Sequence, residues 1–234
     1  MTIEIVYWPI RGMVQHLLVM CEYLGVDYTF KPLDKTVDHP AWGVMKQNNF
    51  PSDWHFGNLP YLIDTEVPAH ATHPLAETDA LVYYIVKKSG NTDLIEANFT
   101  DMADFAMVNG LLRDIKMGIT MPAYMCPSQD GVKAALEGKQ ASVGNKLTGL
   151  AKRLEGGNWL FGQKLNVLDF FFAEILECMA AQEKDMGAIA ISGIPALGEY
   201  LARFKALPQV KAYMEKPEYM QSPWNNYSAQ WGSK

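Results

Sequence analysis

A tyrosine near the start of the chain is placed where it could take part in acid–base chemistry. Residues 7–12 read YWPIRG, between a short apolar stretch at 3–6 and an amphipathic stretch at 14–24. A strand that runs into a helix directs backbone N–H groups and the helix N-terminus at whatever binds there, which favours an anion. The phenol of Tyr7 could donate a hydrogen bond to that anion, and this predicts stabilisation of a bound thiolate. The alternative is that Tyr7 and Trp8 are aromatic residues at the edge of the core.

The composition limits the classes of protein to which the chain can belong. Its 234 residues are 49% hydrophobic, enough for one large domain or two modest ones. The net charge is -6 and basic residues form no run, which argues against a nucleic-acid partner. No apolar stretch reaches the ~20 residues needed to span a bilayer, so no membrane partner is expected.

The cysteines and the N-terminal residues predict the compartment. Cys21, Cys126 and Cys178 are odd in number and follow no spacing pattern, which argues against a disulfide framework. The N-terminus has no basic segment of the kind that begins a signal peptide. Together these features predict a reducing compartment, and we expect the protein to be cytoplasmic.

Strand and helix signals alternate over the first ninety residues. Strands are expected around residues 3–6, 28–30 and 59–64, and a helix over 14–24 is expected to end at Gly25. A second helix is expected to open at residues 77–79, whose acidic and hydroxyl side chains suit a first helical turn.

Helical patterns dominate the chain after a polar connector that begins at Gly90. Asn166 and Asp169 form a variant capping box ahead of a segment, residues 170–176, that is apolar nearly all round. Such a helix is normally buried at the centre of a domain. The sequence therefore predicts a small α/β domain followed by an all-helical one.

The chain resembles the cytosolic glutathione transferases, and most of all their mu class. The resemblance rests on residues 7–12, on Trp42 with Lys46 four residues later, on the segment NLPYLID at 58–64, on the pair at 77–78, on the capping element at 166–169 and on AQWGSK at 229–234. It implies a thioredoxin-like α/β domain over residues 1–89 that binds glutathione, and an all-α domain over residues 98–234 that contributes a hydrophobic substrate pocket. It also implies a homodimer, with glutathione as co-substrate and no other cofactor.

The chemistry of glutathione agrees with the expectation for Tyr7. A free thiol of pKa ~8.5 is only slightly ionised at neutral pH, and the thiolate is the nucleophile. By the resemblance Tyr7 is the catalytic residue, and its O–H would lower the pKa of the bound thiol.

The resemblance also assigns residues to the two ends of glutathione. Trp42 and Lys46 would bind the glycyl carboxylate, with His39 at a position that is usually basic, and Asn58 would support that end. The Leu59 backbone would pair with the cysteinyl backbone through a cis peptide bond to Pro60, and Trp8 belongs to the same site. Thr78 would bind the γ-glutamyl carboxylate, and Glu77 would bind the γ-glutamyl ammonium. Asp114 would reach into the site of the partner subunit. Asp101 and Asp104 lie on the same helix and make this alignment looser, and the alternative is that Asp114 lies on a solvated face of the helix.

Two further sets of residues follow from the resemblance. Phe56, an aromatic residue in a loop, would be buried against the partner subunit at the dimer interface. The electrophile pocket would include adaptable apolar side chains and a tyrosine able to donate to developing negative charge, although each could equally be an ordinary core residue. These residues are Ile10, Met13, Met117, Tyr124 and Asn225.

One segment departs from the family pattern. Residues 65–76 are longer than is typical, and they contain His70 and His73. Because prolines interrupt this segment and no cysteine or carboxylate pair lies nearby, we expect a long hairpin tip and no metal site.

Three classes of function remain open at this point. The first is a transferase that conjugates glutathione to hydrophobic electrophiles, as in detoxification. The second is a glutathione-dependent isomerase or peroxidase, which would use the same residues. The third is a non-catalytic ligand-binding protein on the same fold, which would have no need of Tyr7 or of a nearly full glutathione site.

Overall fold

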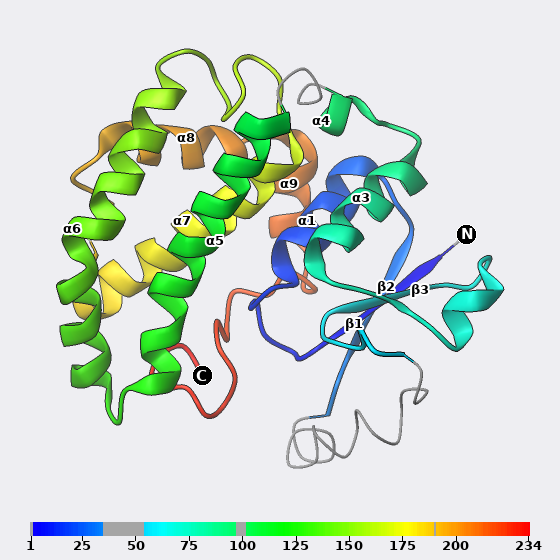
Figure 1. Cartoon of the computed structure of the whole chain (residues 1–234), viewed down its shortest axis with the longest axis horizontal. Helices are drawn as coiled ribbons and strands as arrows, with labels where there is room; N and C mark the ends of the chain where they lie inside the picture. Colours follow the sequence, from blue (N-terminus) through cyan, green and yellow to red (C-terminus); the bar gives the residue numbers. More distant parts are fainter. Residues whose placement is uncertain (1, 35–53, 97–101, 190) are drawn as a thin grey trace. The chain divides into compact units, whose positions relative to one another are not determined.

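The computed structural model describes residues 2–34, 54–96, 102–189 and 191–234. The chain divides into two compact units, Met1–Asn91 and Thr92–Lys234, and each is described by itself below (Figure 1).

The first unit is built on a four-stranded mixed sheet. Its strands are β1 (Ile3–Tyr7), β2 (Tyr28–Pro32), β3 (Tyr61–Asp64) and β4 (Leu75–Ala76), in the order β2-β1-β3-β4. β1 pairs with β2 in parallel and with β3 in antiparallel fashion, placing Ile5 opposite both Phe30 and Leu62. β1 has a neighbour on each side and is buried along most of its length, because all of its residues except the half-buried Glu4 are hydrophobic.

Two helices accompany this sheet. The parallel pair β1 and β2 needs a crossover, and α1 (Gln15–Leu24) supplies it. α1 packs against α3 (Thr78–Ser89), which follows β4 directly (Figure 1). Gly25 ends α1 in the left-handed region at φ 66°, so the predicted helix end is confirmed.

The segment between β3 and β4 is a hairpin, as the sequence predicts. β3 and β4 pair in antiparallel fashion, and the 3-10 helix η1 (Pro68–Ala71) forms the tip between them. His70 accepts a hydrogen bond at Nδ1 from the backbone N–H of Asp64 over 3.1 Å. Within the described ranges, no group of three or more His, Cys, Asp or Glu side chains is placed to hold a metal ion.

The second unit is helical throughout its regular structure. Its helices are α4 (Asp93–Glu96), α5 (Met102–Met125), α6 (Gln129–Leu154), α7 (Val167–Met186), α8 (Pro195–Lys205) and α9 (Pro208–Met214). α5 packs along α6, and α7 contacts both α5 and α8 (Figure 1). α7 is buried over most of its length, as expected for a segment that is apolar nearly all round.

The predicted capping box at the start of α7 is confirmed. Asn166 Oδ1 accepts the Leu168 N–H over 2.8 Å, and Asp169 Oδ2 accepts the Asn166 N–H over 2.9 Å. The other oxygen of Asp169 accepts hydrogen bonds from the Leu160 N–H over 3.0 Å and the Tyr200 hydroxyl over 2.8 Å. Burial raises the pKa of Asp169 to about 6 against the opposing effect of these hydrogen bonds. The carboxylate therefore joins α7 to α8 and to the turn that precedes α7.

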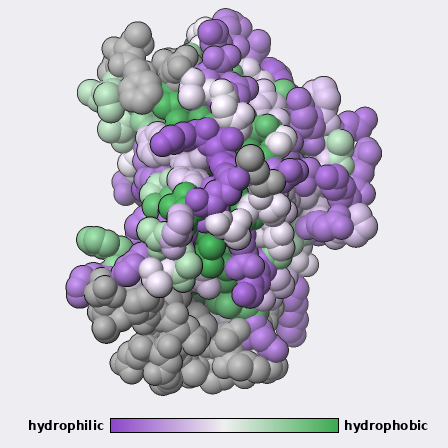
Figure 2. Space-filling view, turned by 90° about the vertical axis from the view of Figure 1, so that its right-hand side faces the viewer, coloured by the Kyte–Doolittle hydropathy of each residue, from purple (hydrophilic) through white to green (hydrophobic). Residues whose placement is uncertain are grey.

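Two observations describe how apolar residues are distributed in the described parts of the chain. Among the helices described, none is long and apolar enough to cross a membrane. The face shown in Figure 2 is dominated by hydrophilic side chains, with smaller groups of hydrophobic side chains between them, as on most protein surfaces.

Replacing the capping carboxylate should strongly destabilise the protein. Asp169→Ala leaves buried donors from Leu160, Asn166 and Tyr200 without their acceptor. We expect the free energy of unfolding in urea to fall by about 3–5 kcal/mol. The matched control is Asp130→Ala in the exposed first turn of α6, which should cost less than about 1 kcal/mol. Equal losses for the two variants would contradict the role given to Asp169.

Candidate active site

Tyr7 is the last residue of β1, and its side chain is only 8% exposed. Its hydroxyl oxygen accepts the backbone N–H of Met13 over 3.3 Å. A hydroxyl that accepts one hydrogen bond can still donate another. The phenol therefore lies at the strand-to-helix junction in a geometry compatible with donation to a bound thiolate.

The segment between β1 and α1 is a tight turn. The Arg11 carbonyl accepts the N–H groups of both Val14 and Gln15, each over 3.0 Å, so the first turn of α1 begins directly after the junction. No side chain caps this helix, since its N-cap residue is Val14. Trp8 and Ile10 are buried, and Met13 is half-buried.

The second part of the candidate site lies at the starts of β3 and α3. The Leu59–Pro60 peptide is cis, as the family resemblance implies, and Asn58 before it is exposed. Glu77 joins β4 to α3 with φ 71°, a backbone conformation that is rare for a residue other than glycine. Thr78, the first residue of α3, is buried, and its position at the helix N-terminus suits a carboxylate.

Three residues assigned to the glycyl end of glutathione cannot be placed. His39, Trp42 and Lys46 lie outside the described residues. Their roles stay predictions from the sequence.

Three candidates for the electrophile pocket lie in the second unit. Both Met117 and Tyr124 lie on α5, where Met117 is exposed and Tyr124 is 37% exposed, so that much of its ring is covered. The Tyr124 hydroxyl oxygen accepts the Asn226 backbone N–H over 2.8 Å, and burial of its ring raises the pKa of Tyr124. Asn225 is buried, and its amide donates to the Trp231 carbonyl over 3.0 Å. The structure therefore gives Asn225 a part in holding the C-terminal turn, which the sequence did not predict.

The acidic residues of α5 differ in their surroundings. Asp114 is exposed and pairs with Lys146 of α6, with 2.9 Å between Oδ2 and Nζ. Asp104 is half-buried and forms a two-point ion pair with Arg153. Asp101 lies outside the described residues. Of the two that are described, Asp114 is the acid that a neighbouring molecule could reach, and its role across the interface stays a prediction.

Phe56 is the most exposed large hydrophobic residue among those described. Its side chain is 79% exposed in a short turn, where the Gly57 N–H donates to the Trp54 carbonyl. A phenylalanine so exposed on a single chain is consistent with burial by a partner, and its place at an interface stays a prediction.

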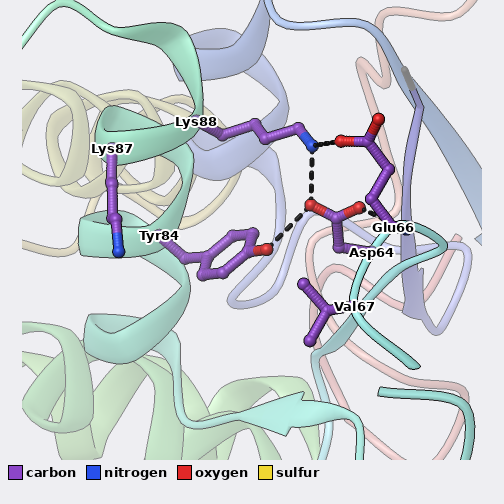
Figure 3. A pocket seen from close by; sticks show the side chains of 6 residues that line it. All are labelled: Asp64, Glu66, Val67, Tyr84, Lys87 and Lys88. Carbon is purple, nitrogen blue, oxygen red and sulfur yellow. Dashed lines mark hydrogen bonds and ion pairs between the residues drawn. The ribbon is translucent and has the colours of Figure 1, made fainter. Parts of the chain in front are cut away.

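A pocket of about 360 Å³ lies at the other end of β3 from Pro60, between the hairpin and α3 (Figure 3). The Lys88 ammonium lies between two carboxylates, 2.8 Å from Asp64 and 2.6 Å from Glu66, and the Tyr84 hydroxyl donates to Asp64 over 2.7 Å. Sequence reasoning missed this group, which we call the hairpin clamp (Asp64, Glu66, Tyr84 and Lys88). Its charges pair with one another, which favours a structural role in fastening the hairpin to α3.

The hairpin clamp shifts the ionisation of its members. Burial alone would raise the pKa of Asp64, but hydrogen bonds from Lys88, the Glu66 backbone and Tyr84 hold that pKa down to about 2. Burial and the bond to Asp64 raise the pKa of Tyr84 to about 12. The hydrogen bonds to Asp64 and Glu66 raise the pKa of Lys88.

The clamp predicts a pH-dependent contribution to stability. The pKa of Asp64 in the folded state, about 2, is below its ordinary value of 3.8. The contribution is therefore present above about pH 4 and is lost as the pH falls towards 2. The difference in free energy of unfolding between wild type and Asp64→Asn should shrink as the pH is lowered from about 6 to about 3. Val67→Ala, an uncharged change in the same pocket, should show a difference that does not vary with pH. A constant difference for Asp64→Asn would contradict the clamp.

Known proteins resemble this chain in sequence and in fold. A family model described as the glutathione S-transferase C-terminal domain matches residues 113–217. The class-mu 26 kDa glutathione S-transferase isozyme 51 of Fasciola hepatica is 27% identical over 97% of this chain and 94% of its own length. Glutathione S-transferase 2 of Gallus gallus is 28% identical over 100% of this chain and 99% of its own length. The crystal structure of the glutathione S-transferase Blo t 8 shares the fold with a TM-score of 0.71, at 18% identity, over 98% of this chain and 99% of that one. In sequence the chain therefore resembles the glutathione transferases, and among them the mu class, and its thioredoxin-like and helical parts have the fold of these proteins.

Proposed function

We propose that the protein conjugates glutathione to hydrophobic electrophiles, with Tyr7 stabilising the thiolate. The observation that carries this proposal is the Tyr7 phenol at the end of β1, with its oxygen hydrogen-bonded by the Met13 N–H. In the reaction the thiolate sulfur attacks an electrophilic atom and a sulfur–carbon bond forms. Either a leaving group departs with its electron pair, or the substrate takes up a proton. No covalent intermediate with the enzyme and no cofactor beyond glutathione is required.

The energetic demand on Tyr7 is modest. Lowering the pKa of a thiol by about two units requires roughly 2.7 kcal/mol of preferential stabilisation of the thiolate. A hydrogen bond from a neutral phenol to a charged acceptor, helped by nearby backbone N–H groups, is of this order.

The remaining glutathione contacts follow the family resemblance. Thr78 at the N-terminus of α3 would bind the γ-glutamyl carboxylate, and Glu77 would bind the ammonium. The strained backbone of Glu77 supports this assignment, since such conformations gather at ligand sites. The other proposed contacts are Trp8, His39, Trp42, Lys46, Asn58, Leu59 and Pro60. Asp114 of the partner subunit would complete the site.

The candidates for binding the electrophile are those that the family resemblance implies. Ile10 and Met13 are the candidates in the first unit, and Met117, Tyr124 and Asn225 are those in the second. The bond that the Tyr124 oxygen accepts from Asn226 supports a role as donor, because that bond leaves the phenolic proton for a developing negative charge. Assays of activity with aryl halides, epoxides, enones and hydroperoxides would distinguish between the functional classes. They would separate conjugation, with a role in detoxification, from the isomerase, peroxidase and ligand-binding alternatives.

We also propose that the protein is a cytoplasmic homodimer. The exposure of Phe56 supports the dimer, since obligate interfaces commonly bury such aromatic anchors. The three cysteines are all free thiols, which suits a reducing compartment.

Removing the Tyr7 hydroxyl should raise the pKa of bound glutathione. Tyr7→Phe should leave glutathione affinity within a few fold and lower turnover near pH 7 by roughly tenfold to a hundredfold, because less thiolate forms. The measurement is the pH titration of thiolate absorbance in the enzyme–glutathione complex. Tyr28→Phe is the matched control, because Tyr28 pairs with Ile3 at the opposite end of β1. If the thiolate titrates at the same pH in wild type and Tyr7→Phe, the proposed role of Tyr7 is wrong.

Replacing Phe56 should weaken the dimer. Phe56→Ser should shift the sedimentation profile towards monomer at low micromolar concentration, because the proposed anchor is lost. Glutathione binding should weaken too, because Asp114 would no longer reach the site of the other subunit. Tyr227→Ser, at an aromatic residue that is 51% exposed, is the control and should leave the profile unchanged. A fully dimeric Phe56→Ser variant would overturn the anchor, and a monomer that binds glutathione as wild type does would overturn the role of Asp114.

A further inference from the structure

Gly12 lies against the ring of Tyr7. A Cβ atom placed on Gly12 would be 2.7 Å from Tyr7 Oη, 2.8 Å from Cε1 and 3.1 Å from Cζ. Real Cβ atoms essentially never come within 3.0 Å of such neighbours. Gly12 also has φ 38°, which L side chains rarely adopt. Two separate constraints, the space and the backbone angle, therefore require glycine here.

The next residue holds the oxygen of the same phenol. The backbone N–H of Met13 donates to Tyr7 Oη over 3.3 Å. Two consecutive residues of the turn thus contact the phenol: Gly12 lies against the edge of the ring, and the Met13 N–H binds the hydroxyl oxygen. The turn cannot shift freely, because the Arg11 carbonyl accepts both the Val14 and the Gln15 N–H groups at the start of α1.

The glycine at the other end of α1 shows that the two constraints are separable. Gly25 has φ 66°, but a Cβ atom there would meet nothing within 4 Å. Glycine is needed at Gly25 for the backbone angle alone, whereas Gly12 also makes room for the Tyr7 ring.

We propose that Gly12 is a positioning residue for the thiolate-stabilising phenol. By having no side chain, it lets the ring lie against the turn with Oη next to the Met13 N–H, and this contact sets the direction in which the hydroxyl donates. The inference rests on the proposed function, in which the Tyr7 hydroxyl lowers the pKa of bound glutathione. Hydrogen bonds weaken steeply as their distance and angle depart from the optimum, so a small displacement of Oη reduces thiolate formation.

The test compares Gly12→Ala with Gly25→Ala. Gly12→Ala should raise the pKa of enzyme-bound glutathione by about one unit, which is about tenfold less thiolate below that pKa. The loss in kcat should shrink as the pH rises and the thiol ionises unaided, while KM for glutathione stays within a few fold. Gly25→Ala shares the strained φ but not the contact, so it should lower stability and leave the thiolate pKa unchanged. In a Tyr7→Phe background, Gly12→Ala should produce no further shift of that pKa.

A second measurement applies if Gly12→Ala folds poorly. Tyr7→Ala removes the two ring carbons and the hydroxyl oxygen that a Cβ at Gly12 would meet, so Gly12→Ala should cost less free energy of unfolding in that background than in wild type. An equal cost in both backgrounds would overturn the contact. A folded Gly12→Ala variant with the wild-type thiolate pKa would overturn the positioning role. If Tyr7→Phe itself left the thiolate pKa unchanged, the proposed function would fail, and the stability comparison would still decide the contact.

Discussion

The hydrogen bond between the Met13 N–H and the Tyr7 hydroxyl is the interaction on which the candidate site depends. It connects the last residue of β1 to the turn that leads into α1, so the position of the phenol follows from the strand and from the helix together. β1 is an interior strand, paired on both sides and buried except at the half-buried Glu4, and it gives the phenol a rigid base. A donor held in this way needs little reorganisation when a charged ligand arrives, which is the condition for effective electrostatic stabilisation.

Features set by local signals could be predicted from the sequence. The left-handed end of α1 at Gly25 depends on one glycine, and the capping box of α7 depends on two polar residues three positions apart. Three strands and two helices of the first unit and the helical second unit were also expected, because period and turn residues mark them. Less of the candidate site could be predicted. The placement of Tyr7 at the strand-to-helix junction was expected, but its hydrogen bond with the Met13 N–H depends on the path of the turn.

Interactions between residues far apart in the sequence could not be predicted. The hairpin clamp joins Asp64 to Lys88, and it forms only because β3 ends beside the last turn of α3. The Tyr124 hydroxyl accepts a hydrogen bond from the backbone N–H of Asn226, which is 102 positions later. A sequence gives the charge or polarity of each residue, but these pairings depend on how whole elements pack. The family resemblance placed Tyr124 and Asn225 near a ligand and did not indicate that both help to hold the C-terminal segment.

The hairpin clamp has a consequence for how the chain can change over time. Lys88 joins the carboxylates of Asp64 and Glu66 to α3. Residues 65–76 therefore form a lobe whose base is held independently of its tip. Lengthening such a loop costs little entropy, since the closure penalty grows only with the logarithm of its length. Substitutions and insertions at the tip can therefore accumulate without altering the pairing of β3 with β1 or the start of α3 at Thr78. The lobe is a part of the first unit in which new surface properties can evolve while the neighbouring backbone stays unchanged.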